Sequence, residues 1–128
     1  MKTEINKDSV FINGIEYQPK SSQIEFVHST EGLPFVIIRT YSAGVHMGYL
    51  KERKSTLAGI EVELINSRRL YYWSGAITLS QLAVEGTIKP LDCKFTIILP
   101  SIELVAIEII KVTEIAFNSL NSVKIWKL

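Results

Sequence analysis

Hydrophobic and polar positions alternate along several short segments of the chain, which is the pattern of β-strands with one buried face. Residues 35–41 are rich in β-branched and aromatic side chains, residues 44–50 continue after a short turn, and residues 60–64 alternate apolar and charged side chains. The Asn-Ser pair at residues 66–67 then predicts a turn into a strand over residues 69–73. We expect these four strands to follow one another as a meander.

Two further segments, residues 94–99 and residues 103–110, are the most apolar of the chain and are separated by Pro100. Such continuous apolar runs predict strands that lie at the centre of a sheet or are buried at an interface. Residues 78–86 and residues 113–120 predict two short helices.

The two predicted helices carry local signals at their ends and on one face. Thr78 offers a hydroxyl as the N-cap of the first helix, and Gly86 is a suitable C-terminal stop. In the second helix, Ala116, Phe117 and Leu120 share one apolar face.

The beginning of the chain differs from the rest. An Asn-Gly pair lies between two apolar pieces within residues 10–17, which favours a tight β-hairpin. Polar, turn-rich stretches follow at residues 18–23 and 29–32. A two-stranded arm is marginally stable alone, so it must dock on another surface, and a neighbouring subunit is one candidate.

Together these elements predict an α+β fold: a mostly antiparallel β-sheet or small half-barrel with two short helices and an N-terminal β-hairpin arm. Residues 1–31 would form the arm and linker, and residues 32–128 a single α+β domain, with Trp126 packing near its end. A length of 128 residues is enough for one domain with a core, and 47% hydrophobic against 21% charged residues describes a folded globular protein.

Charge and cysteine content narrow the possible surroundings and partners. The net charge of +1 gives no overall attraction to nucleic acids or to an anionic membrane, so general nucleic-acid binding is not expected. Cys93 is the only cysteine, which excludes an internal disulfide and suits a reducing compartment. We expect its side chain to be a thiol buried in the core. Residues 1–8 are polar and no apolar segment is long enough to span a bilayer, so we expect a cytoplasmic protein without a membrane partner.

A first group of candidate ligand-binding residues lies where the strand over residues 35–41 ends. Arg39 and Tyr41 combine a cation with a ring, and small residues after them would let backbone amides and the Ser42 hydroxyl approach a ligand. The alternative is an ordinary β-turn. His46 is able to hydrogen-bond a ligand or act as an acid or base, although a histidine without a defined partner is more often structural.

A second group lies in and after the strand over residues 69–73. In an extended strand Arg69, Tyr71 and Trp73 share one face, which would present a cation and two stacking rings to one ligand. Arg68 lies on the other face with Leu70 and Tyr72, and we expect it to be a further phosphate ligand. The alternative is aromatic core packing covered by arginine stems.

Free backbone amides that begin with Ser74 and precede the first helix are also able to bind an anion, unless Thr78 simply caps that helix. The complete set of expected ligand-binding residues is Arg39, Tyr41, Ser42, His46, Arg68, Arg69, Tyr71, Trp73 and Ser74.

No complete catalytic or metal motif accompanies these residues. With two histidines and one cysteine, no spacing resembles a zinc site. The chain has neither a Walker lysine pattern nor the glycine fingerprint of dinucleotide-binding enzymes. Glu103 and Glu108 fall on opposite faces of a strand, which argues against a carboxylate pair for acid/base catalysis. We therefore expect no catalytic residue, no metal and no cofactor, and a nuclease or phosphodiesterase that uses His46 is the least favoured hypothesis.

From about residue 35 to residue 110 the sequence resembles a family of small phage and prophage proteins of unassigned function. The segments that carry the resemblance are residues 39–48 (RTYSAGVHMG), 68–69 (RR), 72–76 (YWSGA), 78–79 (TL), 82–83 (LA) and 106–110 (AIEII). The arm lies outside the resemblance. Small phage proteins of this kind include oligomeric anti-defence sponges, which sequester nucleotide signals made by host immune systems.

By analogy with such sponges, the leading hypothesis is a non-enzymatic homo-oligomer that binds a cyclic ADP-ribose isomer or a cyclic dinucleotide between subunits. In it Arg39, Arg68 and Arg69 would hold phosphates while Tyr71 and Trp73 stack on bases. The alternative from another class is a protein-protein interaction module that binds a host or phage protein through the arm and the apolar strands. Stabilisation by nucleotides is expected only for the first.

Overall fold

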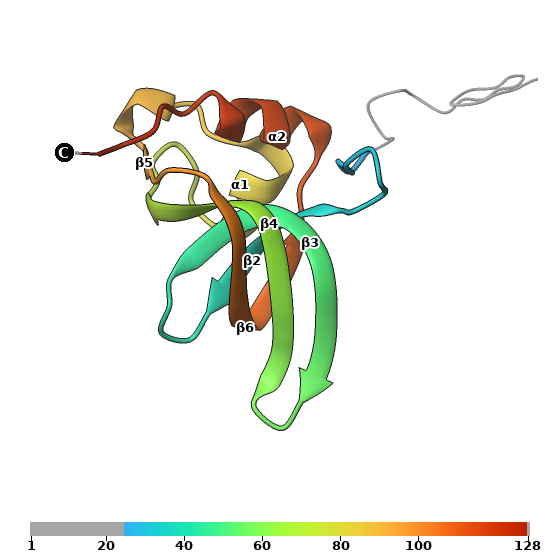
Figure 1. Ribbon diagram of the computed structural model, residues 1–128. Helices are drawn as coiled ribbons and strands as arrows, with labels where there is room; N and C mark the ends of the chain where they lie inside the picture. The colour runs from blue at the N-terminus through green and yellow to red at the C-terminus, as the bar shows by residue number, and fades with distance from the viewer. Residues whose placement is uncertain (1–24, 128) are drawn as a thin grey trace, which may run out of the picture.

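The computed structural model describes residues 25–127 of the chain. The elements in chain order are β2 (Phe35–Thr40), β3 (Val45–Thr56), β4 (Gly59–Tyr72), α1 (Leu79–Glu85), the 3-10 helix η2 (Pro90–Asp92), β5 (Lys94–Phe95), β6 (Leu99–Lys111) and α2 (Glu114–Asn121). In Figure 1 both α-helices lie on one side of a curled sheet, and the β3–β4 hairpin extends away from them. The predicted α+β class, with a mostly antiparallel, half-barrel-like sheet and two short helices, is confirmed. The hairpin expected within residues 10–17 lies outside the described residues.

The sheet has the strand order β3-β2-β6-β4-β5, with antiparallel pairing throughout. An additional pairing of β3 with β4 joins the first strand of this order to the fourth, so the sheet curls back on itself. β6 pairs with β4 through residues 99–106 and with β2 through residues 106–111. It is therefore a central strand, as its apolar sequence predicts.

The turn expected at residues 66–67 is instead a bulge inside β4. Asn66 has a φ of 51°, and the register between β3 and β4 shifts between Met47 and Tyr49. Asparagine adopts this left-handed conformation more readily than most residues, so it accommodates the extra residue of a bulge as well as a turn. The predicted turn is therefore wrong, because the chain continues through residues 66–67 within one strand.

β3 also extends beyond its predicted end. Residues 51–55 are exposed strand, and Thr56 pairs with Gly59 where the hairpin turns. Because the outer part of β3 buries no side chain, it has no apolar alternation from which the strand could be recognised.

The strand predicted over residues 94–99 is wrong in extent. Only Lys94 and Phe95 form β5, which lies at the end of the strand order, and β6 already begins at Leu99 and includes Pro100. Among the described residues, β6 has a strand partner only on its β4 side over residues 99–105. Proline is tolerated in a strand with such a free edge.

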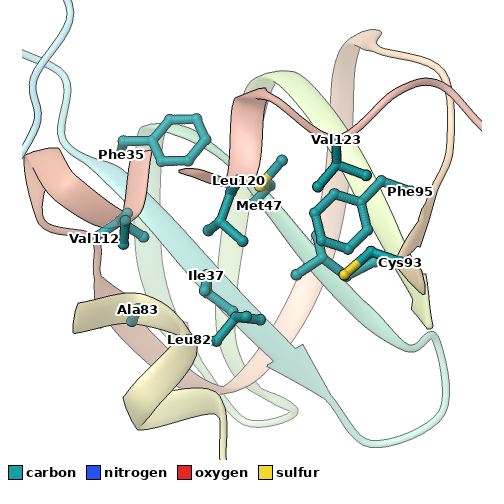
Figure 2. Close-up of a cluster of buried hydrophobic side chains, with 12 residues drawn as sticks. Phe35, Ile37, Met47, Leu82, Ala83, Cys93, Phe95, Val112, Leu120 and Val123 are labelled. Carbon is teal, nitrogen blue, oxygen red and sulfur yellow. The ribbon is translucent and has the colours of Figure 1, made fainter. Parts of the chain in front are cut away.

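One hydrophobic cluster, which we call the helix-side cluster, lies between the sheet and the helices. Figure 2 shows the side chains of Phe35, Ile37, Phe95, Leu82 and Leu120 pointing towards one another in this cluster. Cys93 is buried in the same cluster, which confirms its prediction as a core thiol.

A second hydrophobic cluster lies on the other face of β2. Val36 and Ile38 pack there with Val62, Leu64 and Ala106, which come from β4 and β6. Since neighbouring residues of β2 enter different clusters, this strand is buried on both faces.

The two helices begin and end close to the predicted residues. The Thr78 hydroxyl accepts a hydrogen bond from the Gln81 amide, and Gly86 ends α1 with a φ of 77°. Thr113 caps α2 in the same way, and its hydroxyl donates to the Val84 carbonyl at 2.7 Å, which joins the two helices. Among the described residues, no helix has the length and apolar character that crossing a membrane requires.

Part of the segment assigned to the arm belongs to the surface of the domain. The Val27 amide donates to Val112, and the Val27 carbonyl accepts from Phe35. The Glu25 carbonyl also accepts a hydrogen bond from the amide of Glu114, at the start of α2. Residues 25–27 are thus tied to the end of β6 and to α2.

Candidate binding surface

Arg68 lies in the protein interior, with 4% of its surface exposed. Its guanidinium donates to the carbonyl oxygens of Thr96 at 2.9 Å, Val123 at 3.0 Å, and Phe95 and Lys124 at 3.3 Å. Burial lowers the pKa of Arg68, but a guanidinium keeps its proton at physiological pH. These carbonyls occupy the donors that we expected to hold ligand phosphates, so Arg68 is not part of the candidate surface.

His46 is also buried, with 1% of its surface exposed. Its Nε2 lies 2.8 Å from the Ala43 carbonyl oxygen and donates to it, which makes Nδ1 an acceptor in the neutral ring. Nδ1 has no hydrogen-bond partner among the described residues. Burial lowers the pKa of His46 below its ordinary value, the hydrogen bond to Ala43 opposes this, and the charge of Arg69 lowers the pKa further. The ring is neutral and structural, which is the alternative that the sequence left open.

The segment after β2 forms a turn that is closed by its own hydrogen bonds. The Thr40 hydroxyl donates to the Gly44 carbonyl and accepts from the Ala43 amide, both at 2.8 Å, and Gly44 has a φ of 86°. Tyr41 and Ser42 are exposed on this turn.

Arg39 forms an ion pair with Glu108, which faces it across the β2–β6 pairing. The Arg39 Nε lies 2.9 Å from Glu108 Oε1, and both side chains are about half exposed. The carboxylate already neutralises this cation, which weakens it as a phosphate ligand.

Trp73 and Ser74 belong to the packed loop between β4 and α1. Trp73 is partly buried against the helix-side cluster. The Ser74 amide donates to Cys93 Sγ at 3.5 Å, and its carbonyl accepts from the Thr87 hydroxyl. The ring and the amide expected to bind a ligand therefore serve the local packing.

Tyr71 and Arg69 remain exposed on β4, on the face that the strand alternation assigns to both. Tyr71 has 65% of its surface exposed and stacks on Trp126, which has 43% exposed. The two ring centroids lie 5.7 Å apart and the ring planes differ by 4°. The ring beside Tyr71 thus comes from the end of the chain, and not from Trp73.

A lysine and a third ring complete this surface. Lys94 Nζ lies 5.2 Å from the centroid of the Trp126 ring and 6.0 Å from that of Tyr72. We call Tyr71, Tyr72, Lys94 and Trp126 the aromatic platform. Its cation lies within the range of cation–π attraction to two rings.

The position of Tyr72 differs from the prediction for a physical reason. The β4–β5 register shifts between Leu70 and Tyr72, so strict alternation ends there. Tyr72 is half exposed instead of following Leu70 into the core. Sequence reasoning missed Tyr72, Lys94 and Trp126 as site residues. The aromatic residue between lysines at positions 124–127 was a signal that could have indicated Trp126.

A groove of about 410 Å³ lies elsewhere, on the outer part of the sheet. Its lining includes Glu52, Glu63 and Glu103, which face one another on three adjacent strands, together with Glu61. Of the described residues that line the groove, Lys54 is the one cation. The groove is acidic and is a poor place for an anion. Within residues 25–127, no group of histidine, cysteine and acidic residues is arranged to hold a metal ion.

Fold and surface together define a small α+β protein with a curled antiparallel sheet and an exposed platform of rings and a cation. Residues 33–120 match the family model described as "Domain of unknown function (DUF6948)", and the chain belongs to this family. No curated protein and no solved structure matches the chain. The matched residues include Tyr71, Tyr72 and Lys94, whereas Trp126 lies beyond them.

Proposed function

We propose that the protein binds an anionic, nucleotide-derived ligand on the aromatic platform and holds it without converting it. The observation that carries this proposal is the exposed stack of Tyr71 and Trp126 with Lys94 beside it. Aromatic rings stack on bases of any sequence, and lysine and arginine neutralise phosphates. Arg69, two residues before Tyr71 on the same strand face, supplies a second cation.

The ligand class follows from the analogy with anti-defence sponges. We infer a cyclic ADP-ribose isomer or a cyclic dinucleotide, bound in the cytoplasm, and a phage or prophage anti-defence role for its sequestration. A homo-oligomer suits this role because one platform covers only one side of a flat ligand, and a second copy would cover the other. The protein needs no catalytic residue or cofactor for this function.

The test measures binding and chemical fate together. Calorimetry and native mass spectrometry are carried out with cyclic ADP-ribose, ADP-ribose and cyclic di-AMP as probes. We expect a defined oligomer that retains one probe with its mass unchanged. Failure of the wild-type protein to bind or be stabilised by any of these probes would refute the proposal.

Single substitutions test whether the ligand binds to the aromatic platform. Tyr71→Ala is expected to weaken the affinity about 5- to 150-fold, because losing one base–ring stack costs about 1–3 kcal/mol. Leu57→Ala is the control, since Leu57 is fully exposed between β3 and β4 and lies outside the platform and the other candidate groups. Equal affinities of the two variants would place the ligand elsewhere. Lys94→Gln is expected to weaken binding and to reduce its salt dependence.

A second candidate function is a protein-protein interaction, which a different observation favours. Ile77, Ile88, Leu91 and Ile115 are at least 72% exposed and lie in or near the helices, where large exposed apolar side chains are candidates for protein contacts. Loss of a co-purifying partner in Ile77→Ser/Leu91→Ser, but not in Tyr71→Ala, would support this function. Retention of the partner in Ile77→Ser/Leu91→Ser would exclude this surface.

A further inference from the structure

Arg68 connects two segments that are distant in the sequence. Two of its acceptors, the Phe95 and Thr96 carbonyls, belong to β5 and the residue after it. The other two, the Val123 and Lys124 carbonyls, follow α2. The guanidinium carbon also lies 5.4 Å from the centroid of the Phe95 ring. One buried side chain therefore holds both segments together.

These two segments carry half of the aromatic platform. Lys94 directly precedes Phe95, and Trp126 is two residues after Lys124. The Phe95 carbonyl accepts a second hydrogen bond, at 2.9 Å, from the amide of Trp126. Ile125 forms a parallel bridge with Phe95. The position of the Trp126 ring thus depends on the contact that Arg68 maintains.

We propose that Arg68 is a positioning residue for the aromatic platform, which fixes the end of the chain against β5 and so holds Trp126 in its stack with Tyr71. The consequence for ligand binding rests on the proposed function, but the effect on Trp126 does not. A lysine cannot replace Arg68 in this role. Its three donors share one nitrogen, whereas the arginine fork reaches acceptors on both segments from separate nitrogens.

The chain has two tryptophans, so Trp73→Phe leaves Trp126 as the single fluorescent indole. In this background we expect Arg68→Lys to shift the Trp126 emission to longer wavelength and to increase its quenching by acrylamide about twofold, while the far-ultraviolet circular dichroism at 20 °C is retained. Arg53→Lys is the matched control, because Arg53 is exposed on β3 and lies outside the platform. Identical emission and quenching in the two variants would overturn the proposal.

A measurement on the unaltered protein covers the case in which Arg68→Lys does not fold. Hydrogen exchange of the Trp126 amide is expected to be slow, because this amide donates to Phe95. Exchange at the rate of an unstructured peptide would show that the segment is not held, and would also overturn the proposal.

A double-mutant cycle distinguishes this inference from the proposed function. With the probe that the wild-type protein retains, Arg68→Lys is expected to weaken affinity about tenfold, within the range of one lost base–ring stack. In a Trp126→Ala background, Arg68→Lys is expected to cause little further loss of affinity for the probe. Full additivity would refute positioning through Trp126. If no probe binds but Trp126 still responds to Arg68→Lys, the proposed function fails and the positioning role stands.

Discussion

Replacing Gly48 by alanine tests how the sheet closes on itself. An added Cβ at this position would lie 3.1 Å from the Ile65 carbonyl oxygen, 3.1 Å from Ser67 Cα and 3.3 Å from Leu64 Cβ. Two of these atoms belong to the backbone of β4 on either side of the Asn66 bulge. They cannot move away without disturbing the β3–β4 pairing that closes the sheet.

The expected loss of stability follows from two opposing effects. Overpacking of a well-packed site costs about 1–3 kcal/mol. Alanine recovers about 0.5–1 kcal/mol, because it restricts the unfolded chain more than glycine does. We expect Gly48→Ala to lower the free energy of unfolding by about 1–2 kcal/mol, which corresponds to a decrease in Tm of about 4–8 °C for a domain of this size.

Urea denaturation followed by circular dichroism measures this change, and Gly44 provides the matched control. Gly44 has a φ of +86°, and an added Cβ would meet no atom within 4 Å, so an alanine there is opposed by backbone conformation alone. Asparagine tolerates that conformation better than alanine, so Gly44→Asn should be more stable than Gly44→Ala. At Gly48 the order should reverse, because the larger side chain meets the same backbone atoms. The same order at both positions, or an unchanged stability of Gly48→Ala, would refute the steric explanation.

Three further predictions concern ionisable side chains. Arg68→Met is expected to lower the free energy of unfolding in urea by about 2–4 kcal/mol, because buried carbonyls lose their donor, whereas Arg53→Met should change it by less than about 0.5 kcal/mol. Burial depresses the pKa of His46 in the folded state below its unfolded value of about 6.5, so the unfolded state takes up a proton more readily. The free energy of unfolding should therefore fall as the pH decreases below about 6.5. His46→Gln should flatten the stability profile between pH 7 and pH 5, and an unchanged slope would assign the pH dependence to other groups. A double-mutant cycle of Arg39→Gln with Glu108→Gln should give a coupling below about 1 kcal/mol, since both side chains are about half exposed, and a larger value would show that the pair is better shielded than its exposure indicates.

Sequence predicted the local parts of the fold well because their signals are local. The Thr78 cap of α1 uses a hydrogen bond within one turn and can be read from a few residues, whereas the Thr113 cap of α2 was not predicted although its signal is equally local. The bulge at Asn66 and the exposed part of β3 were not predictable in this way. A left-handed asparagine suits a turn and a bulge equally, and a strand without a buried face has no periodic pattern.

The candidate surface was only partly predictable because its parts are distant in the sequence. Arg69 and Tyr71 were identified from strand alternation, which is a local property. Arg68 was assigned to a ligand because nothing near it in the sequence reveals acceptors 55 and 56 positions away. The stack of Tyr71 on Trp126 depends on the same long-range contact between chain segments.

The burial of β2 on both faces has a consequence for how the molecule unfolds. Ile37 contacts the helix-side cluster and Ile38 the cluster inside the curled sheet, so adjacent residues of one strand belong to two separate cores. Neither core can open while β2 keeps its hydrogen bonds to β3 and β6. When β2 separates from the sheet, both cores lose the side chains that β2 contributes to them. The two cores should therefore melt in a single cooperative transition, and the amides of β2 should be among the last to exchange with solvent.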